Sequence, residues 1–123
     1  MKIPSISEAE WDVMTVIWAS HPITATEVVD SLAGKKNWNP RTVKTLLNRL
    51  VKKGALAYTV DGKKYLYRPK VQQHQCVLHE SRSFLSRVFA GDAAAMLLRF
   101  VDEVDLSPEE INQLKKAIDK KRG

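Results

Sequence analysis

The stretch from Asn39 to Gly54 constrains this chain most, because it combines the start and stop signals of a helix with two chemically different faces. Asn39 can cap the free N–H groups at a helix start, and Pro40 suits the first helical position because its missing N–H would be unpaired there. Gly54 can adopt the left-handed conformation that ends a helix. These signals predict a helix of about four turns over residues 40–53.

The two faces of this predicted helix differ sharply. At 100° per residue its apolar side chains fall on one side; they are Val43, Leu46, Leu47, Leu50 and Val51. The other side and its flanks are basic or hydrogen-bonding, with Arg41, Thr42, Lys44, Thr45, Asn48, Arg49 and Lys52. A solvated amphipathic helix usually mixes acids with its bases, yet this stretch contains no Asp or Glu.

Arg, Thr and Asn side chains presented near a helix terminus are what reading of the DNA major groove requires. We therefore expect the polar face to bind DNA. The residues expected nearest the bases are Arg41, Thr42, Lys44, Thr45 and Asn48, and Arg49 and Lys52 are expected nearer the phosphates.

The distribution of charge supports a nucleic-acid partner. The chain of 123 residues has a formal net charge of +6. Residues 35–70 contain eleven Lys and Arg against one Asp, whereas residues 1–34 are net acidic and residues 71–123 balance eight bases with eight acids. The whole excess of positive charge lies on the predicted helix and the segments beside it, as a nucleic-acid footprint should.

Two helices are expected before the basic helix. Ser7 and Glu10 have the spacing of a capping box, and so do Thr24 and Glu27. The chain therefore reads helix, turn, helix, loop, helix.

After Gly54 the apolar residues alternate with a period of two, which predicts two strands. Asp61 and Gly62 separate the strands and indicate a tight hairpin turn between them. A basic hairpin directly after a basic third helix is the layout of a winged helix-turn-helix. The hairpin residues that we expect to touch DNA are Lys63, Lys64, Tyr65 and Arg68.

Arg68 and Pro69 close this unit, so we expect a DNA-binding domain over residues 1–70 and a second domain over residues 71–123. The second domain is predicted to contain three helices. Its apolar stripes include Phe84, Leu85, Val88, Phe89, Met96, Leu97, Phe100, Val101, Ile111, Leu114 and Ile118. About fifty residues are too few to bury such stripes alone, which predicts a homodimer. The expected fold is thus mainly helical, with a small β-hairpin wing and a three-helix dimerisation domain.

Several function classes are disfavoured. The single cysteine, Cys76, excludes an internal disulfide and fits a reducing cytoplasm. No apolar run approaches the roughly 20 residues that cross a membrane, and the first residues lack the apolar core of a signal peptide. No phosphate loop, zinc-hydrolase motif or nucleophile elbow is present. We expect a cytoplasmic protein that is not an enzyme and has no cofactor, metal centre or small-molecule substrate.

Two alternatives stay open at this stage. His74, Cys76 and His79 lie close together in sequence and are ordinary ligands of Zn²⁺ or Cu⁺, so a metal-responsive repressor of the same fold is possible. Only Cys76 and His79 share a helical face, and a fourth ligand is not evident. A pure protein-interaction module is the other alternative, but it leaves the basic segment unexplained.

With these residues in view, the chain resembles the penicillinase repressor family, the BlaI/MecI type of winged-helix transcriptional repressor. The resemblance covers almost the full length. It is carried by residues 10–18, by the run from Trp38 to Gly54, by Phe84-Leu85 with Val88-Phe89 and Gly91, by Leu97-Leu98 with Phe100-Val101, and by residues 106–110.

The resemblance implies a homodimer on an inverted-repeat operator of a β-lactamase-type or related operon. It also implies relief of repression by proteolysis within the dimerisation domain, triggered by a membrane-bound sensor metalloprotease. Well-known members are cut between Asn and Phe, and the matching pair here is Arg99 and Phe100. The Phe matches, whereas Arg stands in the place of Asn.

Overall fold

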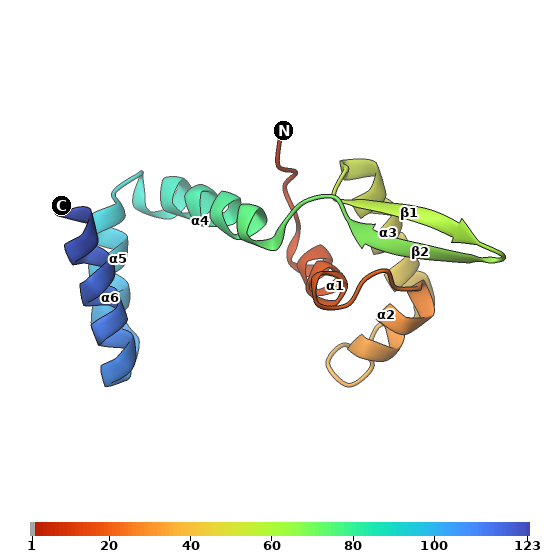
Figure 1. Ribbon diagram of the computed structural model, residues 1–123, viewed down its shortest axis with the longest axis horizontal. Helices are drawn as coiled ribbons and strands as arrows, with labels where there is room; N and C mark the ends of the chain where they lie inside the picture. Colours follow the sequence, from red (N-terminus) through yellow and green to blue (C-terminus); the bar gives the residue numbers. More distant parts are fainter. Residues whose placement is uncertain (1) are drawn as a thin grey trace. The chain divides into compact units, whose positions relative to one another are not determined.

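The structure is a computed structural model that describes residues 2–123 (Figure 1). Its elements follow in the order α1 (Glu8–Ala19), α2 (Ala25–Leu32), α3 (Pro40–Lys53), β1 (Leu56–Asp61), β2 (Lys64–Pro69), α4 (Gln73–Phe89), α5 (Ala93–Glu103) and α6 (Pro108–Lys121). The predicted fold class, mainly helical with one two-stranded wing, is confirmed. The chain divides into two compact units, one ending at Ser81 and the other starting at Arg82.

The first three helices begin where the capping signals predict. Ser7 Oγ accepts a hydrogen bond from the Glu10 N–H at 3.2 Å, and the Ser7 N–H donates to the Glu10 carboxylate at 2.9 Å. Thr24 and Glu27 form the same reciprocal pair at the start of α2. At α3 the Asn39 side chain accepts from the Thr42 N–H at 2.9 Å, and Gly54 ends the helix with φ of 84°.

The core of the first unit forms around the apolar face of α3. Four of the five residues predicted on that face are buried, namely Val43, Leu46, Leu47 and Leu50, and Val51 is half-buried. They pack in one cluster with buried side chains from α1, α2 and the hairpin, which include Met14, Ile17, Val28, Leu56 and Tyr67. The predicted division of α3 into a packed and a free side is confirmed.

The hairpin is antiparallel, and Asp61 pairs with Lys64 at its end. The turn residues are therefore Gly62 and Lys63, one position later than the predicted Asp61–Gly62 turn. Gly62 has φ of 65° at the first turn position, which is where a type II′ turn needs glycine. Gly62 alone supplies the positive φ that the turn requires. Asp61 is therefore not needed in the turn and pairs with Lys64 as the last residue of β1. A backbone bridge between Ile23 and Tyr67 joins β2 to the segment before α2.

The start of α4 belongs to the core of the first unit. Val71, just before α4, and Cys76 in its first turn are buried, and the Trp18 indole N–H donates to the Val71 carbonyl at 3.0 Å. The compact units consequently divide within α4, eleven residues after the boundary expected at residue 70. The division into functional domains at residues 70 and 71 stays a prediction.

The second unit has almost no interior in a single chain. Neither α5 nor α6 contains a buried residue. Phe84, Phe89 and Phe100 form a small aromatic cluster with ring centroids 6.0 to 6.4 Å apart. Leu97, Val101 and Ile118 are each more than half exposed. The apolar stripes of this unit are left largely uncovered.

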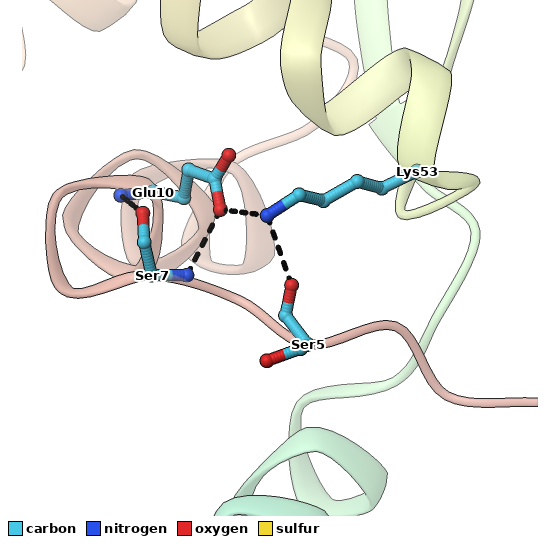
Figure 2. A network of polar contacts seen from close by, with 4 residues as sticks. All are labelled: Ser5, Ser7, Glu10 and Lys53. Atoms are coloured by element: carbon cyan, nitrogen blue, oxygen red, sulfur yellow. Dashed lines mark hydrogen bonds and ion pairs between the residues drawn. The ribbon is translucent and has the colours of Figure 1, made fainter.

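One ionic network inside the first unit links α1 to the end of α3 (Figure 2). Glu10 is almost fully buried and pairs with the Lys53 ammonium group, which also donates to the Ser5 carbonyl at 3.0 Å. Burial alone would raise the pKa of Glu10. The hydrogen bonds from Lys53 and Ser7 outweigh that effect and hold the pKa of this carboxyl below its ordinary value of 4.5.

This network predicts a pH-dependent contribution to stability. A lowered pKa in the folded state means that Glu10 stabilises the fold fully above about pH 4.5 and loses this contribution as the pH falls through the folded-state pKa. We expect Glu10→Gln to lower the free energy of unfolding by about 1 to 3 kcal/mol at pH 7 and by less below pH 4. Urea titrations followed by tryptophan fluorescence measure this, since Trp11, Trp18 and Trp38 all lie in the first unit.

Asp12→Asn is the matched control, because it removes the acid of the pair with Lys36, which is far more open to solvent than the buried Glu10 carboxylate. Its cost should be about 0 to 1 kcal/mol. A Glu10→Gln deficit that stayed constant from pH 7 to pH 3 would contradict the assignment.

Candidate nucleic-acid interface

The polar face of α3 is open to solvent along its whole length. Six of the seven residues expected to bind DNA on this helix are exposed, and Thr42 is half-buried. The Thr42 hydroxyl donates to the Asn39 cap at 3.2 Å, and the Thr45 hydroxyl donates to the Arg41 carbonyl at 3.0 Å. These bonds fix the rotamers of both threonines while leaving their oxygens able to accept hydrogen bonds.

The basic residues of this face are not neutralised by acids. Within residues 2–123 the ion pairs are Lys36 with Asp12, Lys53 with Glu10, and Arg99 with Glu103. Arg41, Lys44, Arg49 and Lys52 take part in none of them. Their donors and charges are therefore available to an anionic partner.

The wing brings a second group of basic and aromatic side chains. Lys63, Lys64, Tyr65 and Arg68 are all exposed. Tyr65 stacks on Tyr58 across the two strands, with ring centroids 4.6 Å apart and planes within 5° of parallel. Because side chains alternate along a strand, Arg68 lies on the opposite face of the hairpin from Tyr65 and Tyr67.

A recess lies where α2, α3 and the wing meet. It brings together five of the predicted residues, Lys44 and Asn48 from α3 with Lys63, Lys64 and Tyr65 from the wing. The other predicted residues do not line this recess, which also contains residues that sequence reasoning did not include. These are Thr24, Ala25, Thr26 and Glu27 at the start of α2, and Tyr67.

Glu27 is the one acid that lines this recess, and its carboxylate is hydrogen-bonded to Thr24 at the start of its own helix. The backbone N–H and the hydroxyl of Thr24 donate to the same carboxylate oxygen, and these bonds hold the pKa of Glu27 below its ordinary value. The positive charge of Lys64 adds a smaller lowering. The capping box was visible in the sequence, but its position beside the wing depends on tertiary packing.

The metal-responsive alternative finds no support in the geometry. Cys76 points into the core, whereas His74 and His79 are exposed. In the part of the chain from residue 2 onward, no group of three or more His, Cys, Asp or Glu side chains could hold a metal ion. Among the same residues, no helix combines the length and the apolar content needed to span a bilayer.

Comparison with known proteins shows the family of this chain. The family model described as penicillinase repressor matches residues 6–120. The chain is 42% identical over 113 residues to the penicillinase repressor of Bacillus licheniformis, covering 92% of this chain and 88% of that protein. It is 34% identical over 120 residues to the methicillin resistance regulatory protein MecI of Staphylococcus aureus strain N315, covering 98% of each.

A solved structure extends the comparison to DNA. It is the solution structure of the monomeric form of Bacillus licheniformis BlaI in complex with the blaP half-operator. This chain matches it with a TM-score of 0.52 and 43% identity, over 58% of this chain and 88% of that one. The resemblance noted in the sequence is confirmed. An acid-free helix face beside a basic wing, together with a family match over nearly the whole length, establishes that this chain belongs to the penicillinase repressor family of DNA-binding transcriptional repressors.

Proposed function

We propose that the chain acts as a homodimer on an inverted-repeat operator, with α3 of each protomer in the major groove and the wing on the phosphate backbone. The observation that carries this proposal is the exposed face of α3. Four basic side chains on this face have no acidic partner among residues 2–123. The positive charge supplies affinity for the DNA backbone. The Thr and Asn side chains that lie between the basic residues can read the edges of the DNA bases.

Dimerisation is proposed as the source of tight binding. One winged helix reaches few bases, so high affinity needs two copies that are held at a fixed spacing. The relative from Bacillus licheniformis was solved with a half-operator in its monomeric form, which supports one winged helix for each half-site. The uncovered stripes of the second unit are the surfaces expected to join the two copies.

Relief of repression is proposed to occur by cleavage between Arg99 and Phe100, by a membrane-bound sensor metalloprotease. Both residues lie in α5, where Arg99 faces Glu103 at 3.8 Å and Phe100 packs with Phe84 and Phe89. A cut there would break α5 and detach α6. We place the protein in the cytoplasm, with the DNA that it binds, and expect it to control a β-lactamase-type or related operon.

Base reading by α3 is tested by Arg41→Ala and Thr45→Ala. Each should lower affinity for the operator by about 1 to 3 kcal/mol and relax the preference at one base position. Quantitative gel shifts on a duplex selected from random-sequence DNA by the parent protein measure this. Thr15→Ala is the matched control, because the Thr15 hydroxyl makes the same bond to the carbonyl four residues back at an exposed position of α1. Parent-like binding by both variants would refute the assignment.

The wing is expected to contribute mainly charge. Replacing Lys63 and Lys64 together by Ala should flatten the dependence of log K on log salt by up to about 0.9 for each lost phosphate contact, with the sequence preference little changed. Fluorescence anisotropy at several salt concentrations gives the slope. Replacement of Lys115 and Lys116 in α6 removes two exposed lysines of the other unit and should leave the slope as it was. An unchanged slope in the wing variant would take the hairpin out of the interface.

The dimer is tested by Leu97→Ala and Phe100→Ala. Truncating a Leu or Phe in a packed interface costs about 2 to 5 kcal/mol, and twofold symmetry applies the loss twice. We expect a largely monomeric protein with an intact winged helix and much weaker operator binding, measured by sedimentation and gel shift. Leu98→Ala is the control, an exposed neighbour outside the predicted dimer residues. A monomeric variant with full operator affinity would overturn the mechanism.

A further inference from the structure

The contacts that hold α3 in place are of two kinds. Its apolar face packs into the core, and apolar packing is non-directional, so by itself it leaves the helix some freedom to roll about its axis. Directional contacts are fewer. The hydrogen bonds of Asn39, Thr42 and Thr45 stay within the helix and its cap. Among the residues that the structure describes, Lys53 is the α3 residue whose side-chain hydrogen bonds reach another segment.

We propose that Glu10 and Lys53 are positioning residues for operator recognition, which set the orientation of α3 without touching DNA themselves. This inference rests on the proposed role of the α3 polar face in reading bases. It gives Lys53 a role different from that of its neighbour Lys52, although both belong to the basic segment of the sequence.

The anchor point is itself rigid. The oxygen of Glu10 that receives Lys53 also accepts the Ser7 N–H at 2.9 Å, so it is fixed by the first turn of α1 (Figure 2). Only 2% of the Glu10 side chain is exposed, compared with 37% of that of Lys53. Ser5 lies in the segment before α1, and its carbonyl accepts a hydrogen bond from the same ammonium group at 3.0 Å. Lys53 is therefore clamped between two groups that belong to a different part of the chain.

Such a clamp matters more for base reading than for attraction to phosphates. At 1.5 Å per residue, Asn48 lies about 7.5 Å along the axis from Lys53, and Arg41 about 18 Å. All these residues belong to one continuous helix, so a small roll at the anchored end turns the whole reading face by the same angle. Hydrogen bonds to base edges weaken steeply once their geometry is lost, whereas charge–charge attraction falls off slowly with distance.

The two neighbouring lysines give a sharp test. The variants are Lys53→Met, which keeps the aliphatic stem, Lys53→Arg, which keeps the charge, Glu10→Gln, and Lys52→Met. The probes are a duplex selected from random-sequence DNA by the parent protein and a scrambled duplex of the same composition. Affinities are measured over a range of salt, at a temperature where circular dichroism finds each variant folded.

We expect Lys53→Met to weaken binding to the selected duplex on the order of tenfold, which corresponds to about 1.4 kcal/mol. Binding to the scrambled duplex and the salt slope should stay at the parent values, and Lys53→Arg should restore most of the affinity. Lys52→Met should instead weaken both duplexes alike and flatten the salt slope. Glu10→Gln combined with Lys53→Met should cost no more than the larger single effect, since the two residues act as one unit.

Lys36→Met is the control for loss of a paired lysine, because it breaks a half-buried ion pair that also ends on α1 but involves no residue of α3. It should leave unchanged the ratio of the affinity for the selected duplex to the affinity for the scrambled duplex. The proposal is overturned if Lys53→Met behaves like Lys52→Met, which would make Lys53 a phosphate contact. It is equally overturned if folded Lys53→Met keeps the parent ratio, which would leave the network a purely structural role. Failure of the parent protein to select any duplex would instead refute the proposed function itself.

Discussion

The structure of the first unit depends on one constraint, which is that α3 must bury one face while it leaves the other without partners. Leu47 and Leu50 are fully buried, yet Asn48 and Arg49 between them are exposed. Burial of the apolar face holds the helix against α1, α2 and the hairpin. Because that packing uses only apolar side chains, the basic side chains of the opposite face remain exposed to solvent.

Three acids of the N-terminal third are engaged in contacts that leave this face basic. Glu27 forms the cap of α2 with Thr24, Asp12 pairs with Lys36, and Glu10 pairs with Lys53 and accepts from Ser7. Glu10 and Asp12 are thereby paired with lysines outside the polar face of α3, and Glu27 is engaged by the cap of its own helix. One of these acids, Glu10, joins α1 to the end of α3, while the basic side chains Arg41, Lys44, Arg49 and Lys52 face solvent.

Local signals predicted most of the fold, because caps, glycine stops and apolar periodicity act over a few residues. These signals predicted where α1, α2 and α3 begin. They also predicted which face of α3 packs into the core. Features that join distant segments were not. The Glu10–Lys53 pair spans 43 residues, and the recess beside Thr24 needs α2, α3 and the wing together. Val71 and Cys76 looked like the start of a second domain, but burial assigns them to the first core. Such contacts follow from tertiary packing, for which short patterns carry no signal.

The distribution of buried residues also bears on how a repressor of this kind could be switched off. Every buried residue between 2 and 123 lies at or before Cys76, so the first unit completes its core without α5 or α6. A cut between Arg99 and Phe100 would remove nothing from that core. What it would remove is the apolar surface of α6 and of the end of α5 from Phe100 onward, neither of which has a buried residue in a single chain. Loss of repression would then follow from loss of the second copy rather than from unfolding of the winged helix, since two weakly bound winged helices separate once nothing holds their spacing.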